Sequence, residues 1–282
     1  MKGKDMHKAT ITAALAAASL LAFSACKQQP AANEAAPAQT ASAGDINGTW
    51  KADLDSVQFD QKPDEFLLQA GQYTCKSCVP QVTVPADGAF HPIKTPSADS
   101  LAVKVIDDRN VTRTAKKGGR QIGETKMTVS ADGNTLTGSF TDTSVEGAPA
   151  GKGEYTETRA APAPAGAHAI SGQWKPAKLA NFNAEALTFT YNVEGDMLHM
   201  KSGTGQSFDA KFDGPPVKIN GDLAGTMASV KRTADGGFEE TDSRDGKVVG
   251  VFNFSVDATG KGRGHAENKE DGSKVTFTAT KQ

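Results

Sequence analysis

Apolar and polar residues alternate along much of the chain after about residue 45. Leu187, Phe189 and Tyr191 alternate with polar residues, and the same period of two returns in residues 248–256 and 275–279. This alternation is typical of β-strands that have one buried and one solvated face. Long stretches with a helical period are not found in the sequence. We therefore predict an all-β protein.

The alternating segments belong to an internal repeat with an offset of about 125 residues, which is typical of a duplicated domain. Both tryptophans of the chain occupy matching positions, Trp50 in Gly-Thr-Trp-Lys and Trp174 in Gly-Gln-Trp-Lys. The two copies end in matching segments, residues 155–158 and 277–280. We expect the two copies to share one topology.

Asp-Gly pairs lie between the alternating segments and predict turns. They begin at Asp87, Asp132, Asp213, Asp245 and Asp271. Gly and Asp accept the positive φ that tight hairpins require. The spacing predicts an antiparallel meander of about eight to ten strands in each copy. Because such a sheet must hide its edges, we expect two tandem β-barrels or barrel-like sandwiches.

Composition divides the chain into five segments. We predict a signal peptide in 1–25, a flexible tether rich in Ala, Pro and Gln in 26–44, a first barrel-like domain in 45–160, an Ala/Pro linker in 161–169, and a second domain in 170–282. The tether has few bulky side chains, so it cannot bury enough surface to offset the entropy of ordering.

The N-terminal segment resembles the lipobox of bacterial lipoproteins. Basic residues precede an apolar run over residues 9–23 that is too short to span a bilayer, and small residues then precede Cys26. Phe23 stands where the family usually has Leu. The resemblance implies that Cys26 is the lipidated first residue of the mature protein, and Lys27 after it favours the outer membrane, facing the periplasm. Ordinary cleavage and a soluble periplasmic protein are the alternative.

Charge excludes one class of partner. The leader carries three Lys and one Asp, so the remaining chain has a net charge of about −4. It has no basic tract longer than Lys116-Lys117. Such a surface is a poor partner for nucleic acid or anionic headgroups. We expect contact with the membrane through the lipid at Cys26 instead.

Catalytic motifs are lacking in the sequence. It contains no Gly-x-Ser-x-Gly, His-Glu-x-x-His, phosphate-binding or dinucleotide-binding signature, and its five histidines are scattered. The acidic stretch 239–242 is expected to be a solvated surface. We therefore predict a protein that is not an enzyme, with neither catalytic residues nor a cofactor.

Cys75-Lys76-Ser77-Cys78 occurs in the first copy only and allows three interpretations. A disulfide suits an oxidising periplasm, a redox pair needs a helix N-terminus, and a metal site needs further ligands. Strand and turn patterning here favours the disulfide. A copper site is a weaker hypothesis, based on Met197 and on His199, which an offset of 124 residues places opposite Cys75.

The Gly-x-Trp openings resemble the first strand of lipocalins and fatty-acid-binding proteins. The whole chain looks like lipobox-bearing proteins with duplicated calycin-like domains and no assigned activity. The resemblance implies that Trp50 and Trp174 plug the closed ends of two barrels. It also implies a binding module for a small apolar or amphipathic ligand. The alternative is an envelope protein that acts through protein contacts, with filled barrels.

Overall fold

The computed structural model describes residues 44–282. The predicted signal peptide in 1–25, the lipidation of Cys26 and nearly all of the predicted tether lie outside the described residues. They remain predictions.

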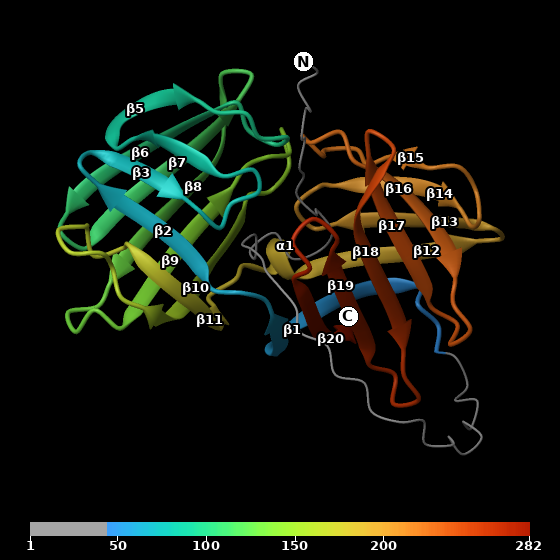
Figure 1. The fold of residues 1–282 in the computed structure, drawn as a ribbon. Helices are drawn as coiled ribbons and strands as arrows, with labels where there is room; N and C mark the ends of the chain where they lie inside the picture. The colour runs from blue at the N-terminus through green and yellow to red at the C-terminus, as the bar shows by residue number, and fades with distance from the viewer. Residues whose placement is uncertain (1–43) are drawn as a thin grey trace, which may run out of the picture.

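The described chain folds into two nearly closed, ten-stranded antiparallel sheets (Figure 1). Each is a meander in which neighbouring strands in space are almost always neighbours in sequence. The all-β, barrel-like fold predicted from the alternation is therefore confirmed, and the arrangement is consistent with a lipocalin-like fold. Within residues 44–282 the helical structure is α1 (Ala184–Leu187), a single turn.

We call the sheet formed by β2 to β11 the first barrel. Its spatial order is β4-β3-β2-β11-β10-β9-β8-β7-β6-β5. The strand bounds are β2 Asp64–Gln69, β3 Gln72–Cys75, β4 Val82–Pro85, β5 Asp87–Pro92, β6 Ser100–Asp107, β7 Asn110–Lys117, β8 Arg120–Val129, β9 Thr135–Asp142, β10 Gly151–Ala161 and β11 Gly172–Ala180.

The second barrel is formed by β1 and by β12 to β20. Its spatial order is β14-β13-β12-β1-β20-β19-β18-β17-β16-β15. The strand bounds are β1 Gly48–Asp60, β12 Thr188–Glu194, β13 Met197–Ser202, β14 Ser207–Lys211, β15 Val217–Lys218, β16 Met227–Arg232, β17 Phe238–Arg244, β18 Lys247–Val256, β19 Gly262–Asn268 and β20 Lys274–Lys281.

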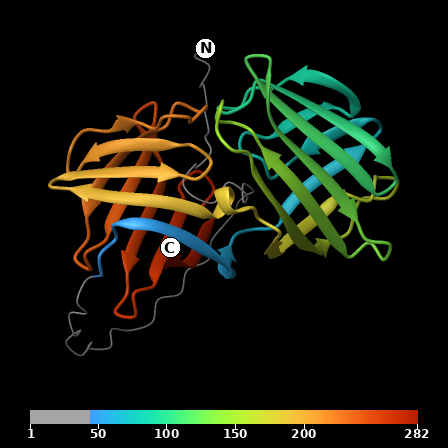
Figure 2. The ribbon, with the colours of Figure 1, turned by 180° about the vertical axis from the view of Figure 1, so that it is seen from behind.

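The first strand of each copy belongs to the barrel of the other copy. β1 opens the first copy, yet it lies between β12 and β20 of the second barrel; β11 opens the second copy and lies between β2 and β10 of the first barrel. Figure 2 shows β1, in blue, crossing from the second barrel towards the first. The two barrels are thus interlocked by an exchange of strands within one chain.

Because of the strand exchange, the predicted domain boundaries do not coincide with the boundaries of the two sheets. Residues 45–160 and 170–282 each contain ten strands, but neither range corresponds to one barrel. Each copy offers equivalent neighbouring strands to a Gly-x-Trp strand. The alternation therefore predicts that the strand exists but does not predict which copy it pairs with. The three residues between β1 and β2, 61–63, carry the chain from one barrel into the other.

Both tryptophans lie fully buried in matching surroundings. The Trp50 indole N–H donates to the Ile46 carbonyl at 2.8 Å, and the Trp174 indole N–H donates to the Ile170 carbonyl at the same distance. A cation lies over each ring: Lys281 is 5.6 Å from the Trp50 ring centre, and the Arg159 guanidinium is 4.0 Å from that of Trp174. The two tryptophans therefore have equivalent buried environments, and their role as plugs of the barrel ends remains a prediction.

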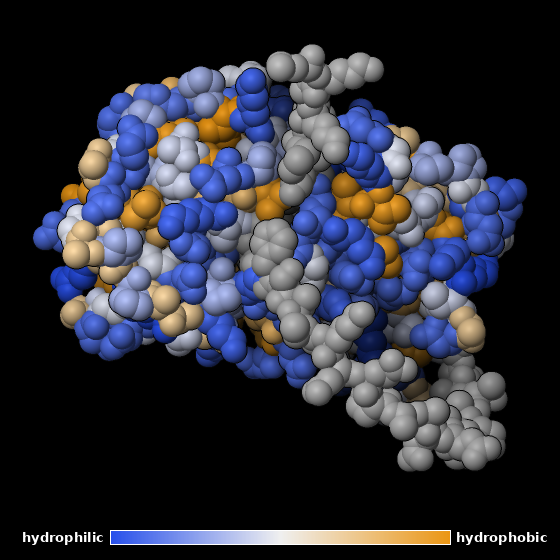
Figure 3. All heavy atoms as spheres, in the orientation of Figure 1, coloured by the Kyte–Doolittle hydropathy of each residue, from blue (hydrophilic) through white to orange (hydrophobic). Residues whose placement is uncertain are grey.

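The outer surface is mainly polar. On the face that Figure 3 presents, hydrophilic residues predominate and hydrophobic residues form small, separate groups on both barrels. The large hydrophobic side chains that are most exposed are those of Phe90, Val105, Ile106 and Val248. The inward and outward positions thus follow the alternation seen in the sequence.

Candidate functional site

The first barrel contains a cavity of about 370 Å³. Its wall is mainly apolar, and the apolar lining includes Phe59, Val82, Ile93, Leu101, Ala115, Phe140, Tyr155 and Leu179. Phe59 comes from the end of β1, so the exchanged strand contributes to the edge of this cavity.

Small inward-facing residues on β7 and β8 leave this space open. Ala115, Gly123 and Thr125 line the cavity on these neighbouring strands. A Cβ added at Gly123 would meet only the Thr141 carbonyl oxygen, at 3.4 Å. Because the sheet circumference is set by its ten strands, short side chains here produce a cavity that larger ones would fill.

Polar side chains meet at the floor of the cavity. Asp64 on β2, Arg113 on β7 and Glu157 on β10 all line it. Arg113 Nη1 donates to the Tyr73 hydroxyl at 2.9 Å, and the guanidinium lies 5.6 Å from the centre of the Phe66 ring. The Asp64 and Glu157 side chains are only 2% and 5% exposed, so three ionisable groups share a site with little water. We call Asp64, Arg113 and Glu157 the polar floor.

The two carboxyl groups of the polar floor hydrogen-bond to each other. Burial raises the pKa of Asp64 well above its ordinary value, and the neighbouring Glu157 carboxylate raises it further. Burial likewise raises the pKa of Glu157, although its hydrogen bond from Asp64 and the Arg113 charge act in the opposite direction. Like charges this close do not both ionise readily, so the pair keeps a proton near neutral pH. The remaining negative charge balances the charge of Arg113.

One acceptor of the polar floor has no partner among the described residues. Glu157 Oε2 is buried and makes no hydrogen bond. A buried carboxylate oxygen without a donor is costly, and such an atom in a native structure calls for an explanation. Since Glu157 lines the cavity, a bound molecule could supply the missing donor.

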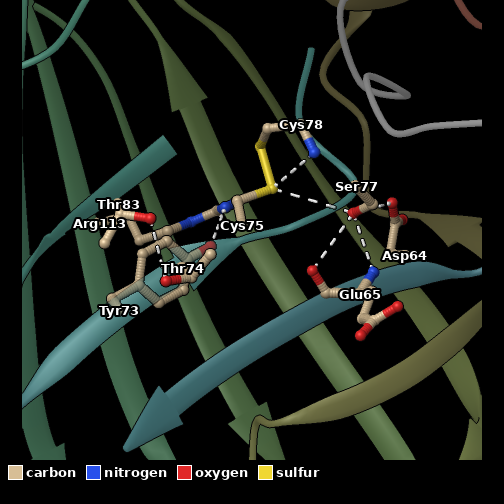
Figure 4. The surroundings of a disulfide bond; sticks show 9 residues. All are labelled: Asp64, Glu65, Tyr73, Thr74, Cys75, Ser77, Cys78, Thr83 and Arg113. Carbon is tan, nitrogen blue, oxygen red and sulfur yellow. Dashed lines mark hydrogen bonds between the residues drawn. A yellow bond between two sulfur atoms is a disulfide. The ribbon is translucent and has the colours of Figure 1, made fainter. Parts of the chain in front are cut away.

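The disulfide predicted from Cys75 and Cys78 is present, with an S–S distance of 2.04 Å. Both cysteines line the cavity. Figure 4 shows the bridge beside the start of β2, where the Ser77 hydroxyl accepts a hydrogen bond from the Glu65 backbone N–H at 2.8 Å. The Asp64 carboxylate accepts a longer hydrogen bond from Ser77 Oγ, at 3.4 Å. The bridge thus borders the cavity next to the polar floor.

The alignment behind the copper hypothesis is wrong by one residue. The hairpin turn between β2 and β3 joins Gln69 to Gln72, and the turn between β12 and β13 joins Glu194 to Met197. Cys75 therefore matches the buried Met200, while the His199 ring is half-exposed and pairs with Asp209. Across residues 44–282, no group of three or more His, Cys, Asp or Glu side chains is arranged to hold a metal ion.

Strand register shows which residues of the second barrel match those around the cavity of the first, and the matching residues differ. Trp174 lies opposite Asp64, whereas Trp50 lies opposite Phe189. Arg113 lies opposite Thr125, and the corresponding pair is Glu240 and Phe252. The remaining matches follow from the ends of the two copies: Tyr155 corresponds to Phe277 and Glu157 to Ala279.

Aromatic rings fill the second barrel where the first is hollow. Phe189, Phe252 and Phe277 are almost fully buried, and the Phe189 ring lies 6.2 Å from that of Phe277 with an edge-to-face arrangement. Tyr191 and Phe238 continue this cluster, with ring centres 4.8 Å apart. Such contacts stabilise a core beyond the area that they bury.

The second barrel also buries a carboxyl pair, at a different place. Glu240 and Asp242 are each 1% exposed and hydrogen-bond to each other. Burial raises the pKa of both groups. The prediction that residues 239–242 form a solvated surface is wrong for these two, because the alternation of β17 turns them inward.

Sequence reasoning missed the polar floor. Arg113 occupies an inward position between Val111 and Ala115, where the alternation predicts an apolar residue. Glu157 aligns with Ala279 of the other copy, and this charged-for-apolar difference was the available signal. Asp64 carries the same kind of signal, because it matches Phe189 of the second copy.

Comparisons with known proteins assign no family. No family model matches the chain, and neither a curated protein nor a solved structure matches it. Over the part of the chain that the structure describes, helices long and apolar enough to cross a membrane are absent. The functional argument therefore depends on the cavity and its residues.

Proposed function

We propose that the first barrel binds a small amphipathic ligand in its cavity. The observation that carries this proposal is an apolar cavity of about 370 Å³ that ends on a cluster of buried polar groups. Small-molecule sites have volumes of roughly 300–1,000 Å³ and combine apolar walls with a few convergent polar side chains. The chain or ring of the ligand would contact the apolar wall, and its polar end would reach the polar floor.

The difference between the barrels supports this proposal. A barrel needs no cavity for stability, as the aromatic filling of the second barrel illustrates. An unfilled interior loses dispersion contacts and costs free energy. A ligand that fills the cavity would offset this cost.

The lipobox-like segment extends the proposal to a location. A protein lipidated at Cys26 would be held at the outer membrane and face the periplasm, with its binding barrel close to a source of amphipathic molecules. Membrane attachment requires more than one acyl chain, which a triacylated cysteine supplies. Globomycin treatment tests this part separately: the unprocessed precursor should accumulate, and unaffected processing would rule out the anchor.

Native mass spectrometry of protein purified from its own cell envelope tests the binding proposal. We expect a bound small molecule on the unaltered protein and none on a Thr125→Phe variant, because the new ring would occupy the cavity as Phe252 does in the second barrel. Thr158→Ala, an outward change on β10, should leave the bound mass in place. Unaltered protein that carries no ligand and also binds none of a series of added amphiphiles would contradict the proposal. A specific protein crosslink in that case would favour the envelope-interaction alternative.

A further inference from the structure

We propose that the polar floor recognises an uncharged hydroxyl head group, so that the ligand of the first barrel is a neutral alcohol-type amphiphile. This inference rests on the proposed binding function and names the chemical class of its ligand. It is based on the unpartnered oxygen of Glu157, the donors of Arg113 and the balance of charge between them.

The unpartnered oxygen requires a donor. Glu157 lines the cavity, and its Oε2 atom is buried and accepts no hydrogen bond from any described residue. A carboxylate head group has no proton to donate when ionised and would place a third acid next to Asp64 and Glu157. A hydroxyl group donates one hydrogen bond to Glu157 and still has lone pairs for an N–H of Arg113. One small group can therefore satisfy both sides of the floor.

The charge balance of the polar floor also favours a neutral head group over a charged one. With one shared proton, the carboxyl pair carries one negative charge, and Arg113 carries one positive charge. A neutral hydroxyl leaves this balance unchanged. An anionic head would leave an excess negative charge unless the floor took up a second proton. A cationic amine would lie next to Arg113 and would leave an excess positive charge unless the shared proton were released. Buried unbalanced charge is expensive, so both charged heads bind with an additional cost.

The other ionisable groups around the cavity are accounted for. Tyr73 on β3 and Tyr155 on β10 face the floor, and burial raises the pKa of each, so both remain neutral. The charged side chains that also line the cavity are Glu124, Asp142 and Lys178. Among the buried groups of the polar floor, the carboxyl pair of Asp64 and Glu157 holds the proton that can move on binding.

Isothermal titration calorimetry with three ligands of equal chain length tests the inference on the unaltered protein. The ligands are 1-decanol, decylamine and decanoate, each titrated at pH 7 in two buffers with different ionisation enthalpies. We expect decanol to bind at least about tenfold more tightly than either charged ligand and to exchange no protons. A tenfold difference corresponds to about 1.4 kcal/mol, which is within the range of one hydrogen bond to a charged group. Decanoate should take up protons, and decylamine should release them.

A variant pair adds a second test. Glu157→Ala reproduces Ala279 of the second barrel and removes the acceptor, so the preference for decanol should disappear; Thr158→Ala, its outward neighbour, should retain it. If the variant does not fold, the series on the unaltered protein decides alone. Equal binding of the three ligands, or tightest binding of decanoate, would overturn the inference and leave the proposed function standing. Failure of all three to bind would reject the proposed function and, with it, this inference.

Discussion

The two barrels have the same strand plan but different interiors. In the first, Asp64, Thr125 and Glu157 border a cavity; in the second, Phe189 and Phe252 occupy the positions of the first two and aromatic rings fill the space. Both barrels keep a buried tryptophan with the same hydrogen bond. The shared features therefore maintain the fold, whereas the differing ones are the basis for our proposal that the first barrel binds a ligand.

The disulfide is a further difference between the two barrels. It occurs beside the cavity in the first barrel, where the second barrel has Met200, a buried core residue. A hollow barrel has fewer packing contacts to hold its strands, so a covalent bridge at the cavity edge compensates for part of that loss. The comparison can be tested by substituting residues in one barrel and measuring the stability of both barrels.

The largest effect is expected from the buried tryptophans. Trp50→Ala should lower the free energy of unfolding by about 5 kcal/mol, because a large buried side chain and its hydrogen bond are lost. The damage should appear in the second barrel, although Trp50 belongs to the first copy by sequence. Hydrogen exchange should show lost protection in β13 and β18, with Trp174→Ala as the matched control that affects β3 and β8. The opposite assignment would contradict the strand exchange.

Opening the filled barrel should have the next largest effect. Phe252→Ala removes a ring that stacks near Phe254 and Phe277. The expected cost is about 3–4 kcal/mol in urea unfolding, and the resulting apolar cavity should bind xenon or benzene. Thr125→Ala at the matching position of the first barrel should cost less than about 1 kcal/mol, because that residue already borders a cavity. Similar costs at the two positions would show that the barrels are packed alike.

Removing the disulfide should cost about 2 kcal/mol, the value expected for so short a closed loop. The variant Cys75→Ser/Cys78→Ser is compared with the unaltered protein by urea unfolding without reductant. We expect the loss of stability to be confined to the first barrel. An unchanged midpoint would mean that backbone hydrogen bonds from Lys76 and Ser77 to the Glu65 carbonyl already hold the loop.

The last effect is a dependence of stability on pH that both barrels share. Because the folded pKa values of Glu157 and Asp242 are raised, the folded state binds more protons than the unfolded state between about pH 4 and 7, and stability falls as the pH rises through this window. We expect a loss of about 1–3 kcal/mol between pH 5 and 8. Glu157→Gln and Asp242→Asn should each reduce this slope, and Glu146→Gln, on the exposed surface, should not. A flat or rising profile would contradict the buried acid pairs.

The fold followed from the sequence because strand alternation and turn chemistry are local. The Asp245-Gly246 turn, with positive φ at both residues, illustrates a correct prediction from residue type alone. Pairing between strands is not local. Both copies present the same pattern to a Gly-x-Trp strand, so the sequence could not show that β1 and β11 change places.

The candidate site was predictable only in part. The cysteine spacing indicated the disulfide, and a binding function was inferred from resemblance. The cavity itself depends on the sizes of side chains from strands distant in sequence, such as Thr125 and Leu179, whose meeting the alternation does not reveal. Asp242 and Glu240 are a second example. Their residue types predicted a solvated surface, but their positions in the alternation of the strand place both side chains in the interior.

The strand exchange is tested most directly by crosslinking introduced thiols. The Thr49 and Thr190 hydroxyls lie 2.9 Å apart on β1 and β12, because β1 belongs to the second barrel. If β1 remained with its own copy, Thr49 would lie opposite Glu65, as Gln173 does. Under mild oxidation, the account predicts a disulfide in the Thr49→Cys/Thr190→Cys variant and none in Thr49→Cys/Glu65→Cys. A disulfide in the second variant and none in the first would contradict it.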